Sequence, residues 1–199
     1  MDAPLLILAS ASPRRRELLQ QLGVTFFCDP ADIDETRLPD EAPRDYVQRM
    51  AREKADAVWQ RHCREQHAVL AADTTVAIDG DVMGKPRNVA DGMAMLRSLS
   101  GRSHQVYTAI CLRNGDDEYS KLVATTVTFT TLSEQTCSAY LATDEPWDKA
   151  GGYGIQGLGG AFVSSISGSY SNVVGLPLCE TWQLLTAIGV NSALESIGE

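Results

Sequence analysis

The N-terminal stretch constrains the fold most, because an uninterrupted apolar run leads directly into a helix start. Residues 5–8 (LLIL) lack polar alternation, which is typical of a strand covered on both faces in a parallel or mixed sheet. Ser12 suits an N-cap, and Pro13 suits the first helical position, where its missing N–H is not needed. Gly23 is a typical stop signal. We therefore predict a strand over residues 5–8, then a turn, and then a helix over residues 13–22.

Three arginines follow this helix start. Arg14, Arg15 and Arg16 occupy the first predicted turn, where the positive end of the helix dipole disfavours a cation by about 0.3–1 kcal/mol per exposed charge. A bound phosphate would reverse that cost, since backbone N–H groups, the hydroxyls of Ser10 and Ser12 and at least one arginine could converge on it. A capped helix with solvated arginines explains the stretch equally well, so both interpretations stay open at this point.

The bulk composition excludes several classes of protein. The 199 residues, 44% of them hydrophobic, suffice for one domain or two compact lobes. With no apolar segment of about 20 residues and no signal-peptide layout, we expect a cytoplasmic protein without membrane contact. The net charge of −9 argues against nucleic-acid binding. Five scattered cysteines indicate neither a disulfide framework nor a zinc site. A small phosphate ligand in a cleft fits the locally basic helix start better.

Acidic residues fill the connection that precedes the second predicted helix. Asp29, Asp32, Asp34 and Glu35 lie within it. We expect most of these carboxylates to be solvated. One carboxylate from the group between Asp32 and Glu35 could still serve a divalent cation, since hard cations prefer oxygen ligands.

Lys54 lies on the apolar face of the helix predicted from Pro43. Its spacing from Val47, Met50 and Val58 places it in the middle of the hydrophobic stripe. Lysine is almost never fully buried without a partner, so its side chain either extends to solvent or points into a polar cleft. We favour the cleft.

Asp73 is the strongest anomaly in the sequence. It lies at the centre of residues 68–78, a strand-like run in which both flanks are strongly β-prone. An ionised carboxylate among apolar neighbours is costly unless it is paired, protonated or bound to a metal. A break between two short strands, capped by Asp73, is the less favoured alternative. A perturbed carboxylate at a strand centre is typical of a general base or a metal ligand.

The remaining pattern alternates helices and strands and predicts an α/β fold with a mixed sheet. We expect a turn at residues 79–80 into a short strand over 81–83, a helix over 90–99, a hairpin of strands 106–112 and 122–132, a helix from 133, a strand over 161–166 and a closing helix over 176–188. Lys85 by itself would be an exposed loop lysine in most proteins.

A glycine-rich run covers residues 151–160, with six glycines in ten positions. It has no hydrophobic period and predicts a loop, in which glycine permits positive φ and a close approach of the backbone to a ligand. A flexible linker is the alternative. The large side chains of Tyr153, Ile155, Gln156 and Leu158 argue against a linker.

Taken together, these segments resemble the Maf family of nucleotide pyrophosphatases over nearly the whole chain. Each motif is weak alone, but their joint order is specific. The resemblance rests on SASPRR from Ser10, Asp34-Glu35, YVQRMAREKA from Tyr46 through Lys54, Ala72-Asp73-Thr74, Gly84-Lys85-Pro86, HQVYT from His104, KAGGYGIQG from Lys149 through Gln156, and VGLPL from Val174.

The resemblance implies a fold and a reaction. The fold would be a mixed twisted sheet with flanking helices, one Maf-like domain over residues 1–199 whose two lobes surround a central cleft, similar to the inosine triphosphate pyrophosphatase (Maf/Ham1) fold. The reaction would convert a nucleoside triphosphate to the monophosphate and pyrophosphate with a divalent cation, Mg²⁺, Mn²⁺ or Co²⁺. A homodimer is expected at the family level.

The resemblance also implies roles for individual residues. Asp73 looks like the proton acceptor that activates water, and Glu35 like the second essential carboxylate; both would face the metal. The phosphate contacts would be Ser10, Arg15, Lys54 and Lys85, with both lysines in the catalytic set. Arg14, Thr74 and Gln156 occupy the three positions that separate subgroups, and this combination resembles the subgroup acting on dTTP and UTP.

Two other functions remain open from the sequence. One is a pyrophosphatase for modified or damaged nucleotides, which tolerates dTTP and UTP. The other is a regulator of septum formation and cell division that binds nucleotide without needing to hydrolyse it. The intact set of Asp73, Glu35, Lys54 and Lys85 argues against a purely binding role, because binding would not require a general base.

Overall fold

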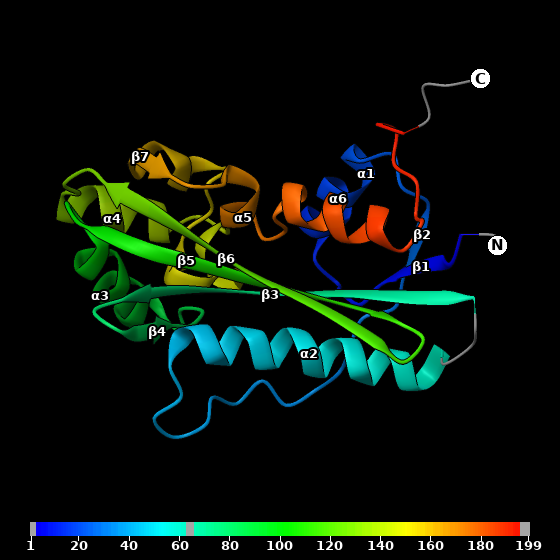
Figure 1. Ribbon diagram of the computed structural model, residues 1–199. Coiled ribbons are helices and arrows are strands. Elements are labelled where there is room, and N and C mark those ends of the chain that lie inside the picture. Colours follow the sequence, from blue (N-terminus) through cyan, green and yellow to red (C-terminus); the bar gives the residue numbers. More distant parts are fainter. Residues whose placement is uncertain (1–2, 63–65, 196–199) are drawn as a thin grey trace.

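A seven-stranded mixed sheet forms the centre of the protein, with helices on both faces (Figure 1). The computed structural model describes residues 3–62 and 66–195. The strands are β1 (Leu5–Leu8), β2 (Phe26–Cys28), β3 (His67–Ile78), β4 (Asp81–Met83), β5 (Ser103–Asn114), β6 (Asp117–Phe129) and β7 (Val163–Ser167). The α/β fold class predicted from the sequence is confirmed.

The sheet contains a gap along one edge of β3. The strand order is β2-β1-β3-β5-β6-β7, and β4 also pairs with β3. Strand β1 is parallel to β2 and β3, and the other pairs are antiparallel. On the edge of β3 opposite β5, the pairing with β1 ends at Leu70 and the pairing with β4 starts at Val76. Residues 71–75 of β3 therefore border an opening between β1 and β4.

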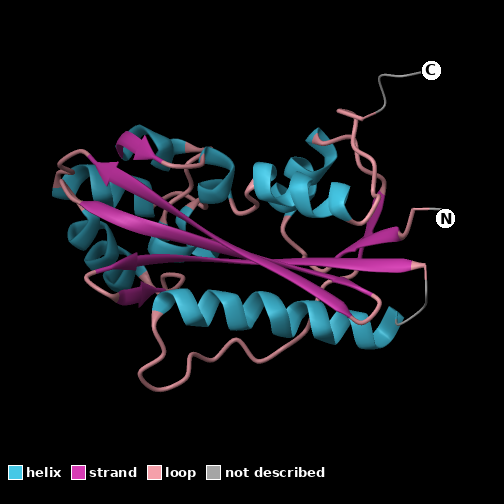
Figure 2. Ribbon diagram, viewed as in Figure 1, coloured by secondary structure: helices cyan, strands magenta, loops and turns pink. Residues whose placement is uncertain are grey.

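The helices fall into two groups around this sheet (Figure 2). The α-helices are α1 (Pro13–Gln21), α2 (Pro43–His62), α3 (Val89–Leu99), α4 (Glu134–Leu141), α5 (Tyr170–Val174) and α6 (Leu178–Ala187), and three short 3-10 helices are η1 (Pro146–Asp148), η2 (Ala150–Gly152) and η3 (Leu158–Phe162). Helix α2 runs along one face beneath the long strands (Figure 1), while α1 and α6 cover the other face beside β1.

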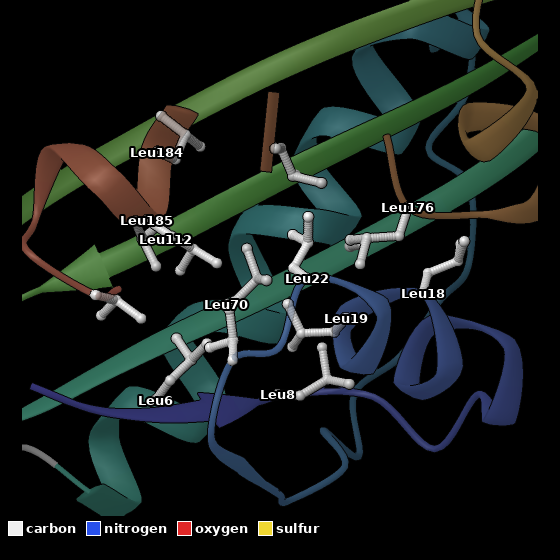
Figure 3. Packing of buried hydrophobic residues seen from close by; sticks show 14 of the residues in the cluster. Leu6, Leu8, Leu18, Leu19, Leu22, Leu70, Leu112, Leu176, Leu184 and Leu185 are labelled. Carbon is white, nitrogen blue, oxygen red and sulfur yellow. The ribbon is translucent and has the colours of Figure 1, made fainter. Parts of the chain in front are cut away.

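The leucine core lies between the sheet and the helices α1 and α6. Figure 3 shows leucines from β1, β3, β5, α1 and α6 packed against one another. On the other face of β1, Ile7 packs with Val47, Ala51 and Val69 beneath α2. Strand β1 is thus buried on both sides, which explains why its sequence shows no polar alternation.

The aromatic core occupies the other half of the molecule. It gathers apolar and aromatic side chains from α3, β5, β6, α4 and the glycine-rich segment. Phe129 stands at its centre, with Tyr153 and Phe162 packed edge to face at ring distances of 4.7 and 5.8 Å. Because β3, β5 and β6 run through both halves, the same sheet supports the leucine core and the aromatic core.

The structure corrects several predicted boundaries. Strand β3 is continuous through Asp73, so the alternative of two short strands is wrong. Strand β5 extends beyond the predicted 106–112 at both ends, because the cross-strand ladder continues through polar residues. Strand β6 both begins and ends earlier than the predicted 122–132. The last strand is Val163–Ser167 rather than 161–166. The helix α5 was missed: it is five residues long, too short for a helical period.

Two expectations from the composition concern membrane-spanning segments and cysteine thiols. Among the described residues, no helix combines the length and the apolar composition needed to cross a membrane. Cys28, Cys111, Cys137 and Cys179 are free thiols, in line with the predicted absence of a disulfide framework. Cys63 lies outside the described residues.

Candidate active site

A cleft of about 860 Å³ opens between the two halves and borders the gap beside β3. It is lined by the β1–α1 turn, the loop after β2, α2, the middle of β3, the segment after β4 and the glycine-rich segment. All nine residues to which the sequence analysis gave a role line this one cleft: Ser10, Arg14, Arg15, Glu35, Lys54, Asp73, Thr74, Lys85 and Gln156. Side chains on both faces of β3 reach the cleft, because no strand pairs there with the edge of β3 opposite β5.

Lys54 joins the two carboxylates at the centre of the cleft. Its Nζ lies 2.7 Å from Asp73 Oδ1 and 2.7 Å from Glu35 Oε1. The side chains of Lys54 and Asp73 are each 11% exposed, whereas that of Glu35 is 53% exposed. The apolar-face position of Lys54 is thus explained by a polar destination, and the prediction that it points into a cleft is confirmed.

The two carboxylates have pKa values shifted in opposite directions. Burial raises the pKa of Asp73 above its ordinary value, although the nearby charges of Lys54 and Arg15 oppose that shift. Partial burial also raises the pKa of Glu35, but the hydrogen bond from Lys54 and the charges of Lys54, Lys85 and Arg15 outweigh it, so the net shift is downward. Asp73 is therefore the stronger base of the two.

Arg15 is held in place by three contacts at the start of α1. Its Nε donates to the Gly175 carbonyl at 2.8 Å, Nη2 donates to Thr74 Oγ1 at 3.1 Å, and Nη1 donates to Ser10 Oγ at 3.4 Å. Burial lowers the pKa of this guanidinium, a cost that a bound anion would offset. Ser12 caps the helix as predicted, with Oγ accepting from the backbone N–H of Arg15.

A chain of hydrogen bonds, which the sequence did not predict, holds Thr74, one of the hydrogen-bond partners of Arg15. Thr74 Oγ1 lies 2.9 Å from Thr108 Oγ1, and Thr108 donates to the carbonyl of Asn172. Asn172 is fully buried and donates to Thr125 and to the Val106 carbonyl. Sequence reasoning did not find this chain, because threonine is common in strands and no local pattern distinguishes the threonines that join such a chain.

The other cations of the cleft differ in their partners. Arg14 forms an ion pair of 3.3 Å with Asp148, which joins α1 to η1 across the cleft. Lys149 also pairs with Asp148, at 2.6 Å. Lys85 is exposed and forms no ion pair among the described residues. The cleft therefore has a cation available for an anionic ligand at the position predicted from the resemblance.

The loop that carries Glu35 is anchored to α2. Tyr46 donates its hydroxyl to the Glu35 carbonyl at 2.9 Å. Arg49 donates to the Thr36 carbonyl and forms a two-pronged ion pair with Glu41, at 2.6 and 2.8 Å. Desolvation and the negative charges of Asp73 and Glu35 raise the pKa of Tyr46 to about 12, so its hydroxyl stays a donor. Sequence reasoning missed these anchors, because the residues involved look like an ordinary exposed helix face.

The glycines of the glycine-rich segment serve two purposes, and the sequence predicted the first of them, positive φ. Positive φ is confined to Gly151 and Gly152 within it. In the cleft loop, residues 154–159, a Cβ at Gly154 would lie 2.7 Å from Lys149 Cε and one at Gly159 would lie 2.8 Å from Tyr140 Oη. Gly154 and Gly159 therefore make room for protein side chains.

The donor set suits a metal that arrives together with a substrate. Within residues 3–62 and 66–195, no three His, Cys, Asp or Glu side chains form a ready-made metal site. Two carboxylates, Asp73 and Glu35, meet in the cleft. Magnesium is usually held by one or two carboxylates together with phosphate oxygens and water, so these two oxygen donors fit such an ion.

Comparison with known proteins agrees with this constellation. The model of the family described as "Maf-like protein" matches residues 5–188. A dTTP/UTP pyrophosphatase of Pseudoalteromonas atlantica is 54% identical over 188 residues, which cover 94% of this chain and 98% of that protein. A dTTP/UTP pyrophosphatase of Escherichia coli K12 is 52% identical over 181 residues, or 91% of each chain.

A solved structure of the Staphylococcus aureus Ham1 protein is 16% identical and has a TM-score of 0.44 over 62% of this chain and 70% of that one. The family, in contrast, is decided by the sequence match, which extends over nearly the whole length of the chain. The protein belongs to the Maf family.

Proposed function

We propose that this protein is a nucleoside triphosphate pyrophosphatase that hydrolyses dTTP and UTP to the monophosphate and pyrophosphate. The observation that carries the proposal is the convergence of Asp73 and Glu35 on Lys54 in a cleft also lined by Arg15 and Lys85. The substrates follow from relatives more than 50% identical that are named dTTP/UTP pyrophosphatase.

Asp73 acts as the general base. Its raised pKa makes the ionised carboxylate a better proton acceptor than an ordinary aspartate. The carboxylate accepts a proton from water while the water oxygen bonds to the α-phosphorus. The bond from the α-phosphorus to the bridging oxygen breaks, and pyrophosphate leaves with that oxygen. The products are the nucleoside monophosphate and pyrophosphate.

The basic residues stabilise the negative charge that develops on the phosphate oxygens. Arg15 is fixed by Gly175, Thr74 and Ser10 before any substrate binds, so little reorganisation is needed during the reaction. Lys85, from the segment after β4, lines the same cleft. Lys54 holds the two carboxylates close to each other, because its ammonium contacts both.

Asp73 and Glu35 would also hold the divalent cation, Mg²⁺, Mn²⁺ or Co²⁺. Such a cation neutralises charge on the phosphate oxygens when it is bound. The lowered pKa of Glu35 keeps this carboxylate ionised at neutral pH, as a metal ligand must be. Arg14, Thr74 and Gln156 line the same cleft and are assigned to recognition of the nucleotide. A cytoplasmic location fits this substrate class.

The decisive experiment is a panel assay of the purified protein. Each of the common nucleoside triphosphates is incubated with Mg²⁺, Mn²⁺ or Co²⁺, and products are resolved as monophosphate plus pyrophosphate or as diphosphate plus orthophosphate. We expect pyrophosphate from dTTP and UTP at the highest kcat/KM, with no activity after chelation by EDTA and recovery when the cation is returned. Orthophosphate alone, or no turnover with any cation, would refute the proposed chemistry.

A further inference from the structure

The cleft loop is held by an acidic side chain that the sequence did not single out. Glu145, just before η1, accepts hydrogen bonds from the backbone N–H groups of Leu158 at 2.7 Å and Gly159 at 2.9 Å. Tyr140 of α4 donates its hydroxyl to the same carboxylate at 2.9 Å and accepts from the N–H of Gly154 at 3.2 Å. One end of the cleft loop is therefore bound to this carboxylate directly and the other end through Tyr140.

The carboxylate stays ionised while it holds the loop. Burial raises the pKa of Glu145, but the hydrogen bonds from Gly159, Leu158 and Tyr140 outweigh burial and the net shift is downward. Gly157 packs directly on this carboxylate, where any Cβ would collide with it. The loop therefore depends on a negative charge at this position and on the absence of a side chain beside it.

The cleft loop presents groups that can recognise a pyrimidine base. Gln156 lies in it, is exposed and lines the cleft. Its amide can both donate and accept hydrogen bonds. Thymine and uracil present the same imide edge, an N–H donor between two carbonyl acceptors, whereas cytosine carries an amino donor in place of one carbonyl. Reading this edge requires the loop to stay in a fixed position.

We infer that Glu145 is a positioning residue for base selection, whose carboxylate fixes the cleft loop so that Gln156 meets the imide edge of a pyrimidine. This inference rests on the proposed function. It separates two tasks in one cleft, since Glu145 acts on recognition through the loop while Asp73, Lys54 and Glu35 act on the phosphate chain. Loss of Glu145 then weakens base binding and leaves phosphate binding intact.

The test is the substitution Glu145→Gln, which keeps the shape but replaces one acceptor oxygen by a donor amide. We expect the Kd for thymidine monophosphate, measured by calorimetry, to rise about tenfold, the effect of losing one charge-assisted hydrogen bond. The inhibition constant of inorganic pyrophosphate stays unchanged. In turnover, KM for dTTP rises with little change in kcat, and the preference for UTP over CTP in kcat/KM falls.

Two further variants make the test independent of folding. Tyr140→Phe removes the hydroxyl that links Gly154 to Glu145 and should shift the same constants in the same direction by a smaller factor. Glu134→Gln is the matched control, because Glu134 pairs with Arg97 outside the cleft. It should change none of these constants.

The outcomes separate this inference from the proposed function. Unchanged thymidine monophosphate affinity and unchanged UTP preference in Glu145→Gln would overturn the inference, even if the wild-type protein releases pyrophosphate from dTTP. An equal loss of pyrophosphate affinity would overturn it as well, since that loss indicates general damage to the cleft. The calorimetric measurement needs no turnover, so it decides the inference even if the protein hydrolyses none of the triphosphates.

Discussion

The cleft residues form two sets that are positioned in different ways, a rigid side (Asp73 and Lys54) and a loop side (Glu35 and Gln156). Asp73 and Lys54 come from the long elements β3 and α2, and their side chains are each 11% exposed. Glu35 and Gln156 come from irregular segments, and the Glu35 side chain is 53% exposed. The first side is positioned by core packing and strand pairing, the second by a few hydrogen bonds from Tyr46 and Glu145. The proposed general base therefore stands on the rigid side, whereas Glu35, the second carboxylate of the proposed reaction, belongs to the loop side.

The largest expected effect comes from Asp73→Asn on the rigid side. General-base catalysis contributes about 10²- to 10⁴-fold, so we expect kcat for dTTP to fall by a factor in this range. The fold and dTTP binding should persist, since the amide oxygen can still accept from Lys54. Pyrophosphate release and calorimetric titration measure the two quantities. The control is Asp81→Asn, on the exposed start of β4, and near-normal turnover in Asp73→Asn would rule out this carboxylate as the base.

Lys54→Met tests whether the rigid side also depends on its ion pair. Removing one partner of a buried pair leaves an uncompensated charge, so the free energy of unfolding should fall by about 3–5 kcal/mol at pH 8. The pKa of Asp73 is already raised in the folded state, and loss of Lys54 raises it further. The destabilisation is therefore present at high pH and becomes smaller as the pH falls through that pKa and Asp73 becomes neutral.

Urea denaturation at pH 5 and pH 8 measures this dependence. Lys121→Met, on the exposed part of β6, is the matched control and should be neutral at both pH values. An equal loss of stability at the two pH values would contradict the assignment of the effect to the Asp73 charge.

The pH dependence of kcat/KM tests whether Asp73 is the base and whether the charge of Glu35 affects it. If ionised Asp73 is the base, kcat/KM for dTTP should fall as the pH falls through its raised pKa, at a pH above its ordinary value of 3.8. The charge of Glu35 contributes to that raised pKa. Glu35→Gln should therefore move the acid limb of the residual activity to lower pH. An acid limb that stays in place in this variant would mean that the two carboxylates do not interact.

The smallest expected effect belongs to Tyr46→Phe on the loop side. The variant removes one hydrogen bond to the Glu35 carbonyl, worth about 0.5–1.5 kcal/mol, so we expect kcat/KM to fall about two- to tenfold. The same loss should lower the Tm by no more than about 2–6 °C. Tyr170→Phe, at an exposed side chain of α5, is the control. A loss as large as that of Asp73→Asn would show that the loop side is as critical as the rigid side.

The sequence predicted the rigid side well because each of its residues violates the pattern of its own element. An acid within a strand and a lysine on an apolar helix face each require a tertiary explanation, whereas arginines at a positive helix end left two interpretations open. Asp73, Lys54 and Arg15 all line the cleft. Such conflicts between local preference and residue type are visible without a structure.

The loop side could not be predicted in the same way. The residues alone narrowed the acidic loop only to the group between Asp32 and Glu35 and gave Gln156 no chemical role, since an acid in an acidic loop and an amide in a glycine-rich loop violate no local rule. The resemblance singled out Glu35 and Gln156. Glu145 was missed because its role is a hydrogen bond to backbone groups more than ten residues away. Every residue except proline has a backbone N–H, so the sequence does not show which of these donors a side chain will bind, and the partners are known only from the folded structure.

The gap beside β3 limits how this protein can vary in length. Side chains alternate along a strand, so Asp73 faces α2 while Thr74 faces Arg15. An insertion or deletion of a single residue between Leu70 and Val76 would exchange these two side chains at the opening. Proton transfer and arginine anchoring would then be lost together. The number of β3 residues between the pairing with β1 and the pairing with β4 therefore cannot change without disrupting this active site, whereas the hairpin turn at residues 114–117 is free to change length.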